Sequence, residues 1–300
     1  MLRKFEDRMD LSETVSITVD AGYSLAQTAA PVAWGAGRWP NHDWIDRRLI
    51  LVAQGESGPL VRRVSQCGST LTIESNDRHA DHQGWAEHVL SLRRIPVVAS
   101  DPVIAALAGQ FAGMRPWCNA GFVEAIATAI IGQSISVQAA AVTERKLCAL
   151  FSEPVTFAGR DFWPFPSAEA LARVKPAFVR QCGVTQRRAD ALVDIARRSE
   201  NGDLLAIEAA VTDVAGTIAA LMQLPMVGRW TAESILLWGI GADDAHPTGD
   251  VALLRAARRA YDRPEMTLKD LDLLAEAWRP GRSWAARYLW LGLFGPAPGE

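Results

Sequence analysis

The chain changes character near Pro96, and this change limits the folds open to it. Before Pro96, short β-branched segments partly alternate apolar and polar residues and end at Gly, Asn or Asp. Candidate strands cover 15–19, 48–53, 60–65 and 69–74. A helical period follows at 85–92, and a short helix at 24–30 is expected to end at Pro31. We therefore predict a small mixed domain with an antiparallel sheet in residues 1–97.

After Pro96 the segments are rich in alanine and leucine at helical spacing, and Pro, Gly or capping residues separate them. The expected helices are 102–111, 120–132, 136–151, 167–175, 186–199, 205–222, 229–239, 250–262, 267–278 and 282–293. Residues 152–166 read as a loop stiffened by prolines. We predict that residues 98–300 are helical throughout and that the whole chain is of the α+β class.

Bulk properties indicate a globular chain. It has 300 residues, of which 49% are hydrophobic and 22% charged, which is enough for two or three packed domains. No apolar run approaches the roughly 20 residues of a spanning helix, and the first residues lack a signal-peptide core. We expect a cytoplasmic protein without a membrane partner.

The four cysteines lie 30 or more residues apart and form no CxxC pair. This spacing argues against a zinc ribbon or an iron–sulfur cluster and favours reduced, mostly buried thiols. The cysteines are Cys67, Cys118, Cys148 and Cys182.

The net charge of −3 does not by itself favour a nucleic-acid partner. Arginines nevertheless cluster in the C-terminal half, at 187–188, 197–198, 255–259 and 279–287, whereas the acids are spread more evenly. A basic face on that half is consistent with these clusters, and so are ordinary solvated helix faces.

The stretch from Leu224 to Asp250 combines a glycine turn with a later acid. Pro225 ends one helix, Gly228 is suited to a positive φ, and the N–H groups that open the next helix point outward, as in a phosphate site. An ordinary helix–loop–helix connection explains the same residues. Asp250 lies twenty positions past Trp230 and, taken alone, is a helix N-cap.

A second motif lies at 132–135, where Gly-Gln-Ser-Ile interrupts two helical segments. Such an interruption either exposes a few side chains on a short loop held between two helices, or is an ordinary interhelical turn.

These motifs resemble those of the helix-hairpin-helix DNA glycosylases of base excision repair, and most closely those of bacterial 3-methyladenine DNA glycosylase II. The resemblance covers essentially the whole chain, weakly in the first hundred residues and clearly from about Phe122 to Trp290. It implies a β-rich N-terminal domain, a helical region with the hairpin at about 217–239, and a cleft between helical lobes.

By this resemblance Asp250 is the catalytic carboxylate, and Trp290 and Trp230 lie at the pocket for the extruded base. A carboxylate stabilises the oxocarbenium-like sugar that forms when an N-glycosidic bond breaks. A tryptophan face attracts a cationic ring, by about 1–2 kcal/mol. The DNA-contacting residues that the family implies are Gly228, Arg229, Thr231, Gln133, Ser134 and Ile135.

Two positions depart from the family pattern. Met226 stands where the family usually has glycine, which leaves open whether the hairpin keeps the monovalent cation, Na⁺ or K⁺, that the resemblance implies at the carbonyls near Met226 and Gly228. Ser134 stands where the wedge of the related enzyme is leucine. Either Ile135 fills the gap left by the extruded nucleotide or Gln133 supports the base stack.

Bifunctional relatives carry a lysine immediately before the position of Thr231, whereas this chain has Trp230 and no lysine from Leu224 to Asp250. A Schiff base with the sugar is therefore not expected. No cysteine lies near the C-terminus, so we expect no iron–sulfur cluster and no other cofactor.

The sequence thus predicts a monomeric, monofunctional glycosylase that removes alkylated bases, of the 3-methyladenine and 7-methylguanine type, from double-stranded DNA. Two alternatives stay open. One is a non-catalytic protein that binds damaged DNA, and the other is a glycosylase for oxidised or deaminated bases.

Overall fold

A computed structural model describes residues 10–209 and 213–299. The N-terminal part is a five-stranded antiparallel sheet in the order β1-β5-β4-β3-β2. The strands are β1 (Glu13–Thr18), β2 (His42–Ile45), β3 (Arg48–Gly55), β4 (Gly58–Cys67) and β5 (Thr70–Ser75). All four predicted strands are present, and β2 is an addition that the sequence analysis missed.

Each face of this sheet is covered by a different part of the chain. Three short helices cover one face and bury residues such as Leu49, Val64 and Ile73. They are α1 (Leu25–Thr28), α2 (Ala30–Trp34) and α3 (His82–Val89). The predicted helix over 24–30 was wrong at its end, because Pro31 occupies the first turn of α2, where its missing N–H costs nothing.

The opposite face of the sheet packs against a hairpin that belongs to the later half of the chain. Strands β6 (Val155–Phe157) and β7 (Arg160–Phe162) pair through a turn in which Ala158 and Gly159 both have positive φ. Phe157 and Phe162 pack with Ile50 and Val61 of the sheet. The predicted loop over 152–166 and the prediction of a purely helical second region were therefore wrong. Three-residue strands flanked by prolines are too short for a periodic signal.

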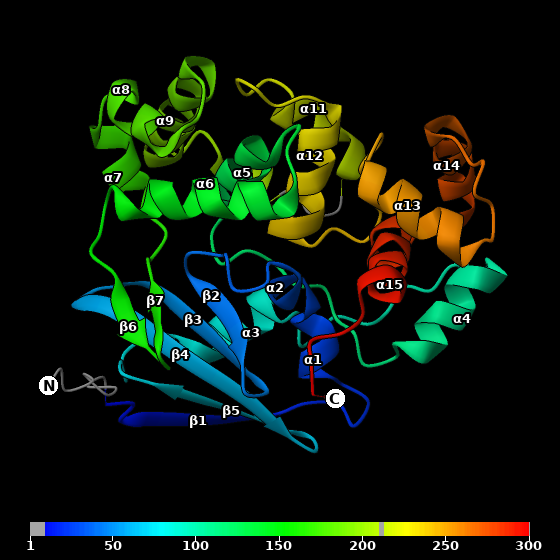
Figure 1. Cartoon of the computed structure of the whole chain (residues 1–300), viewed down its shortest axis with the longest axis horizontal. Coiled ribbons are helices and arrows are strands. Elements are labelled where there is room, and N and C mark those ends of the chain that lie inside the picture. The colour runs from blue at the N-terminus through cyan, green and yellow to red at the C-terminus, as the bar shows by residue number, and fades with distance from the viewer. Residues whose placement is uncertain (1–9, 210–212, 300) are drawn as a thin grey trace, which may run out of the picture.

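Most of the remaining residues form helices, which Figure 1 shows above the sheet except for α4, at the right of the view. They are α4 (Pro102–Gln110), α5 (Phe122–Gly132), α6 (Val137–Ala149), α7 (Ala168–Arg173), α8 (Pro176–Val179), α9 (Gln186–Glu200), α10 (Leu205–Ala209), α11 (Val214–Leu221), α12 (Arg229–Ile235), α13 (Val251–Ala260), α14 (Leu268–Ala275) and α15 (Arg282–Phe294), with short turns η1 (Arg180–Cys182), η2 (Leu236–Ile240) and η3 (Glu276–Trp278). Their positions follow the predicted helices closely, and the predicted helix over 205–222 is two helices whose junction, 210–212, lies outside the described residues.

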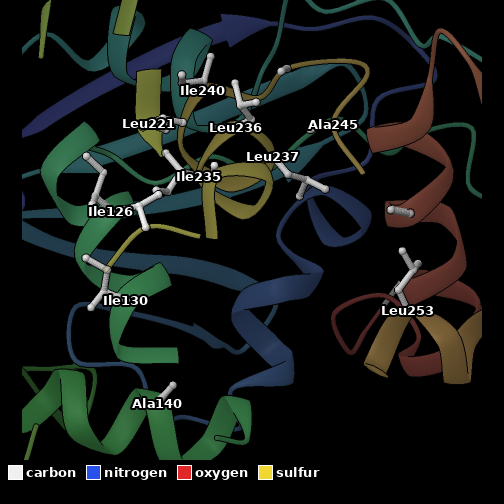
Figure 2. Packing of buried hydrophobic residues seen from close by; sticks show 14 of the residues in the cluster. Ile126, Ile130, Ala140, Leu221, Ile235, Leu236, Leu237, Ile240, Ala245 and Leu253 are labelled. Carbon is white, nitrogen blue, oxygen red and sulfur yellow. The ribbon is translucent and has the colours of Figure 1, made fainter. Parts of the chain in front are cut away.

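One apolar core joins these helices. Ile126 and Ile130 on α5 belong to the same buried cluster as Leu221, Ile235 and residues of the π-helical turn η2, as Figure 2 shows. This packing fixes α11 and α12, the two helices of the predicted hairpin, against the helix that leads into residues 132–136. The division of the chain into 1–97 and 98–300 stays a prediction.

Polar contacts and the C-terminal segment join the N-terminal part to the helices. Asn41 donates to the buried carboxylate of Glu124 at 2.8 Å, and the backbone N–H of Cys118 donates to the carbonyl of Val89 in α3 at 3.0 Å. After α15 the chain returns to the N-terminal part, where Ala297 N–H donates to Ala26. The α+β class is confirmed.

All four cysteines lie within the described residues. The four cysteines are free, and all except Cys67 are buried. Within 10–209 and 213–299, no helix has the length and apolar character needed to cross a membrane.

Candidate active site

Asp250 lies at the start of α13, where both of its carboxylate oxygens have donors. Oδ1 accepts the backbone N–H of Leu253 at 2.7 Å, so the side chain caps the helix, and Oδ2 accepts the indole N–H of Trp230 at 3.1 Å. The N-cap interpretation and the contact with Trp230 therefore hold together. The carboxylate is half-buried, which leaves it accessible to a substrate.

A tight turn presents this aspartate. The N–H of Asp250 donates to the carbonyl of Pro247 at 3.1 Å, and Gly249 has a φ of +82°. A four-residue turn with a positive φ at its third position favours glycine there.

The loop before the turn is held by α14 and α15. Ser283 and Arg282 at the start of α15 bond to Ala245 and Asp244, and His246 pairs with Asp272 at 2.8 Å. Arg94 and the indole of Trp284 both donate to Asp243. These contacts tie the segment before Asp250 to buried structure.

Glu233 contacts the surroundings of Asp250, and the sequence analysis did not single it out. It lies on α12 and is almost completely buried, yet it contacts both the hairpin and the turn: Oε1 accepts Arg229 Nε at 2.6 Å, and Oε2 accepts the N–H of Thr248 at 2.8 Å. The sequence does hold a signal for it: Glu233 is the single acid in the mostly apolar run from 231 to 240. It also lies three residues after Trp230 and four after Arg229, so a helix places all three on one face.

The hairpin between α11 and α12 has a geometry that differs from the prediction in one respect. The positive φ was expected at Gly228, but it occurs at Met226 (+64°), while Gly228 is extended with a φ of −91°. Gly228 is the N-cap of α12 and offers no side-chain acceptor, so no side chain caps the N–H groups that begin this helix.

Gln133 connects the hairpin to the loop at 132–136. Its Nε2 donates to the Met226 carbonyl at 2.7 Å and to the hydroxyl of Thr231 at 2.9 Å, so its amide points into the protein. Arg188 donates to the backbone carbonyl of Gln133 at 2.8 Å. The loop and the hairpin are therefore a single connected unit.

The exposed part of that loop is formed by the three residues that follow Gln133, namely Ser134, Ile135 and Ser136. Ser134 has a φ of +62° and is exposed, and the apolar side chain of Ile135 is 41% exposed.

The two carbonyls to which a cation was assigned already accept hydrogen bonds. Gln133 donates to the carbonyl of Met226, and Ala232 N–H donates to that of Gly228 at 2.9 Å. A backbone carbonyl oxygen has two lone pairs, so each of these oxygens keeps one for a further ligand, and the monovalent cation stays a prediction. Among the described residues, no three His, Cys, Asp or Glu side chains gather where they could hold a metal ion.

Trp290 is buried, with 6% of its surface exposed, and stacks on Trp238 with ring centroids 5.4 Å apart and an angle of 23° between planes. Trp238 lies in the π-helical turn η2, and such turns are frequent at functional sites. The sequence analysis did not single out Trp238. Trp230 instead contacts Asp250 and is half-buried.

A buried cation lies beside this aromatic pair. The guanidinium of Arg287 is 4.5 Å from the ring centroid of Trp238, donates to the Leu237 carbonyl at 2.6 Å, and has an Nε without a partner. Burial lowers the pKa of Arg287 to about 10, so it stays charged at neutral pH.

Comparison with known proteins agrees with this arrangement. Residues 127–280, which contain the hairpin, Asp250 and the loop at 132–136, match the HhH-GPD superfamily of base excision DNA repair proteins. The chain belongs to this superfamily.

Relatives within the superfamily have names that agree with the predicted resemblance. The chain is 32% identical over 203 residues to a probable bifunctional transcriptional activator/DNA repair enzyme AlkA of Mycobacterium tuberculosis, a match that covers 67% of this chain and 40% of that protein. It is 30% identical to DNA-3-methyladenine glycosylase 2 of Escherichia coli, over 59% of this chain and 60% of the relative. The match thus spans less than two thirds of either relative.

Solved structures with the same fold cover almost the whole chain. A 3-methyladenine DNA glycosylase from Archaeoglobus fulgidus has a TM-score of 0.73 at 20% identity, over 92% of this chain and 97% of its own. An 8-oxoguanine glycosylase/lyase from Clostridium acetobutylicum has a TM-score of 0.71 at 18% identity, over 93% and 96%. Because both folds include the sheet, the N-terminal part belongs to the shared architecture.

Proposed function

We propose that the protein is a monofunctional DNA glycosylase that hydrolyses the N-glycosidic bond of alkylated purines in double-stranded DNA. The observation that carries the proposal is the pairing of Trp230 with Asp250: a carboxylate held at a helix start by an indole, at the position where a lyase would present a lysine.

The chemistry requires one ionised acid. When the bond between base and sugar breaks, positive charge develops on the sugar, and a fixed carboxylate beside it stabilises that charge and orients the attacking water. An N3- or N7-alkylated purine is already cationic and leaves as a neutral base, so no second acid has to protonate it. Asp250 therefore suffices.

Strand cleavage through a Schiff base requires an amine near the sugar. The lysines of the described chain are Lys146, Lys175 and Lys269, and none lies between Leu224 and Asp250. We expect an intact abasic site as the product.

The surface that meets DNA is proposed to combine the start of α12 with the loop at 132–136. Uncapped N–H groups at the start of a helix suit a phosphate, and Arg229, whose side chain is 58% exposed, adds a positive charge. Since the amide of Gln133 is bonded to Met226 and Thr231, Ile135 is the better candidate for the wedge. We propose action as a monomer.

The base pocket is proposed at the aromatic pair. Trp238 covers part of Trp290, so an extruded base either stacks on the outer face of the pair or separates the two rings.

A second candidate, release of a neutral oxidised or deaminated base, is favoured by Arg287. A buried cation 4.5 Å from Trp238 opposes a second positive charge in the pocket and stabilises a base that leaves as an anion.

One assay separates these functions. Duplexes that contain 7-methylguanine, 8-oxoguanine or hypoxanthine are incubated with excess protein, and free base is quantified, with strand cleavage measured before and after alkali. Release of methylpurine with cleavage only after alkali supports the proposal. Preferential release of a neutral base supports the second candidate, and binding without any release indicates a non-catalytic damage-binding protein.

A further inference from the structure

Glu233 connects two elements of the site that are far apart in the sequence. Its carboxylate accepts Arg229 Nε at 2.6 Å on the hairpin side and the N–H of Thr248 at 2.8 Å on the side of the acid. Because the two oxygens are used separately, Glu233 joins α12 to the turn without direct exposure to solvent.

The bond to Thr248 is directed at the turn that presents Asp250. Thr248 lies between Pro247 and Gly249 in that turn, and Asp250 closes it by donating to Pro247. By accepting the N–H of Thr248, Glu233 therefore holds the backbone of the turn in the position in which the Asp250 carboxylate lies beside Trp230. Trp230 and Glu233 are three residues apart on α12, so one helix face holds both the side chain of Asp250 and the backbone before it.

Arg229 explains how a carboxylate is tolerated at this depth. A buried carboxylate without partners is strongly unfavourable, and here one charged donor and one backbone N–H satisfy it. The Arg229 side chain remains 58% exposed, so it reaches solvent while its Nε stays with Glu233.

We infer that Glu233 is a positioning residue for Asp250: it holds the turn at Thr248 in place and links that turn to the hairpin through Arg229. The inference rests on the proposed function, because it assigns Asp250 the reacting role. Glu233 itself does not contact the substrate.

The first test is independent of activity. The indole N–H resonance of Trp230, assigned by its loss in Trp230→Phe, reports the bond to Asp250, and hydrogen exchange of the Thr248 amide reports the bond to Glu233. Glu233→Ala is expected to shift the indole resonance and to speed Thr248 exchange at least tenfold. Glu144→Ala is the matched control, because Glu144 is an equally buried acidic side chain on α6 and accepts from Thr128, away from the turn at 247–250. It should change neither signal.

The second test separates positioning from general structure. In single-turnover release of 7-methylguanine, Glu233→Ala is expected to lower the rate 10- to 100-fold while the Kd for the same duplex changes less than threefold. Glu233→Gln keeps an acceptor for Thr248 and should retain the rate within about fivefold. Combined with Asp250→Asn, Glu233→Ala should cause no further loss, since it acts through Asp250.

The outcomes are decisive in either direction. An unchanged Trp230 resonance in Glu233→Ala, an equal loss of rate in Glu144→Ala, or a multiplicative loss with Asp250→Asn would overturn the inference. If the cavity left by alanine prevents folding, Glu233→Leu fills the volume and removes the same acceptor. If the wild-type protein releases no base from any duplex, the proposed function fails, whereas the resonance and exchange measurements still decide the role of Glu233.

Discussion

Two turns carry residues that are proposed to meet DNA: the hairpin turn before α12 and the turn at 247–250, which follows η2. They are held in different ways. In the hairpin, the residue with left-handed φ is Met226 (+64°), whereas in the turn at 247–250 it is Gly249 (+82°). A residue with a Cβ pays about 1–2 kcal/mol for this conformation and glycine does not. The turn before the acid is thus free of a strain that the hairpin carries.

Their supports also differ. The turn at 247–250 is fixed by Glu233 at Thr248 and by Trp230 at Asp250, both from the same buried helix. At the hairpin, Gln133 donates to the carbonyl of Met226 and to the hydroxyl of Thr231, and Arg229 pairs with Glu233. The comparison teaches that the candidate acid and the turn before it are both held from α12, whereas the left-handed residue of the hairpin is held by a side chain from the loop at 132–136.

The largest expected effect comes from the charge of Asp250. Asp250→Asn should lower the rate of base release on the order of 10²- to 10³-fold, because the amide cannot stabilise positive charge on the sugar. Asparagine still caps α13, so thermal unfolding should change little. Asp81→Asn is the control, since Asp81 caps α3 in the N-terminal part. Near-wild-type release by Asp250→Asn would refute the role of the acid.

The two helices on either side of Gln133, α5 and α6, each contain a buried carboxyl group whose titration affects the stability of the protein. Burial raises the pKa of Glu144 to about 8 and that of Glu124 to about 7, and Glu124 adds to the rise at Glu144. Between pH 4.5 and these values the folded chain binds more protons than the unfolded chain, so the free energy of unfolding falls as pH rises.

Glu144→Gln should therefore be more stable than wild type at pH 8, by about 4 kcal/mol, and should gain less than about 1 kcal/mol at pH 5. Thermal unfolding of both proteins across this range measures the difference. If the two proteins differ in stability by the same amount at every pH, Glu144 does not titrate as described.

Gly249→Ala tests whether the turn before the acid depends on freedom from strain. A Cβ at Gly249 meets no atom within 4 Å, so the cost of about 1–2 kcal/mol is purely conformational. Gly202→Ala is a matched control, because Gly202 has the same φ of +82° after α9. Both variants should lose stability, but only Gly249→Ala should also slow base release. Equal rates in the two variants would contradict the comparison.

Ile135→Ala tests the exposed loop that is proposed to meet the base stack. Loss of most of an exposed isoleucine should weaken binding to a duplex with an abasic site by about 1 kcal/mol, or roughly fivefold in Kd. Val137→Ala removes a more exposed apolar side chain, 54% exposed, two residues further on. If the two variants bind alike, Ile135 is not the wedge.

The smallest expected effect is at Met226. Met226→Gly removes the left-handed strain but adds freedom to the unfolded chain, so the net gain should be below about 1 kcal/mol. Asp262→Gly, at another left-handed position with a φ of +50°, should give a similar gain without changing DNA affinity. A loss of stability in Met226→Gly would mean that contacts of the methionine outweigh the strain.

Much of the fold was predictable because its signals are local. Helical spacing and capping residues gave α5, α9 and α15 to within a few residues, and alternation gave β1, β3, β4 and β5. The hairpin β6–β7 was missed since its strands have three residues each and are stabilised by packing on the distant sheet.

The candidate site shows the same division. Asp250, Trp230 and the missing lysine could be read from the sequence through the family resemblance. Glu233 and Arg287 could not, because their importance depends on burial and on partners that are brought together only in the folded chain.

The sequence by itself determined where the helices and most strands lie and which side chain is the candidate acid, because spacing, caps and residue chemistry are properties of neighbours along the chain. The tertiary structure alone decided that Met226 rather than Gly228 takes the left-handed conformation, that Gln133 points inward, and that Glu233 links the hairpin to the turn before Asp250. The physical reason is that buried polar groups require partners, and only folding determines which groups are buried together.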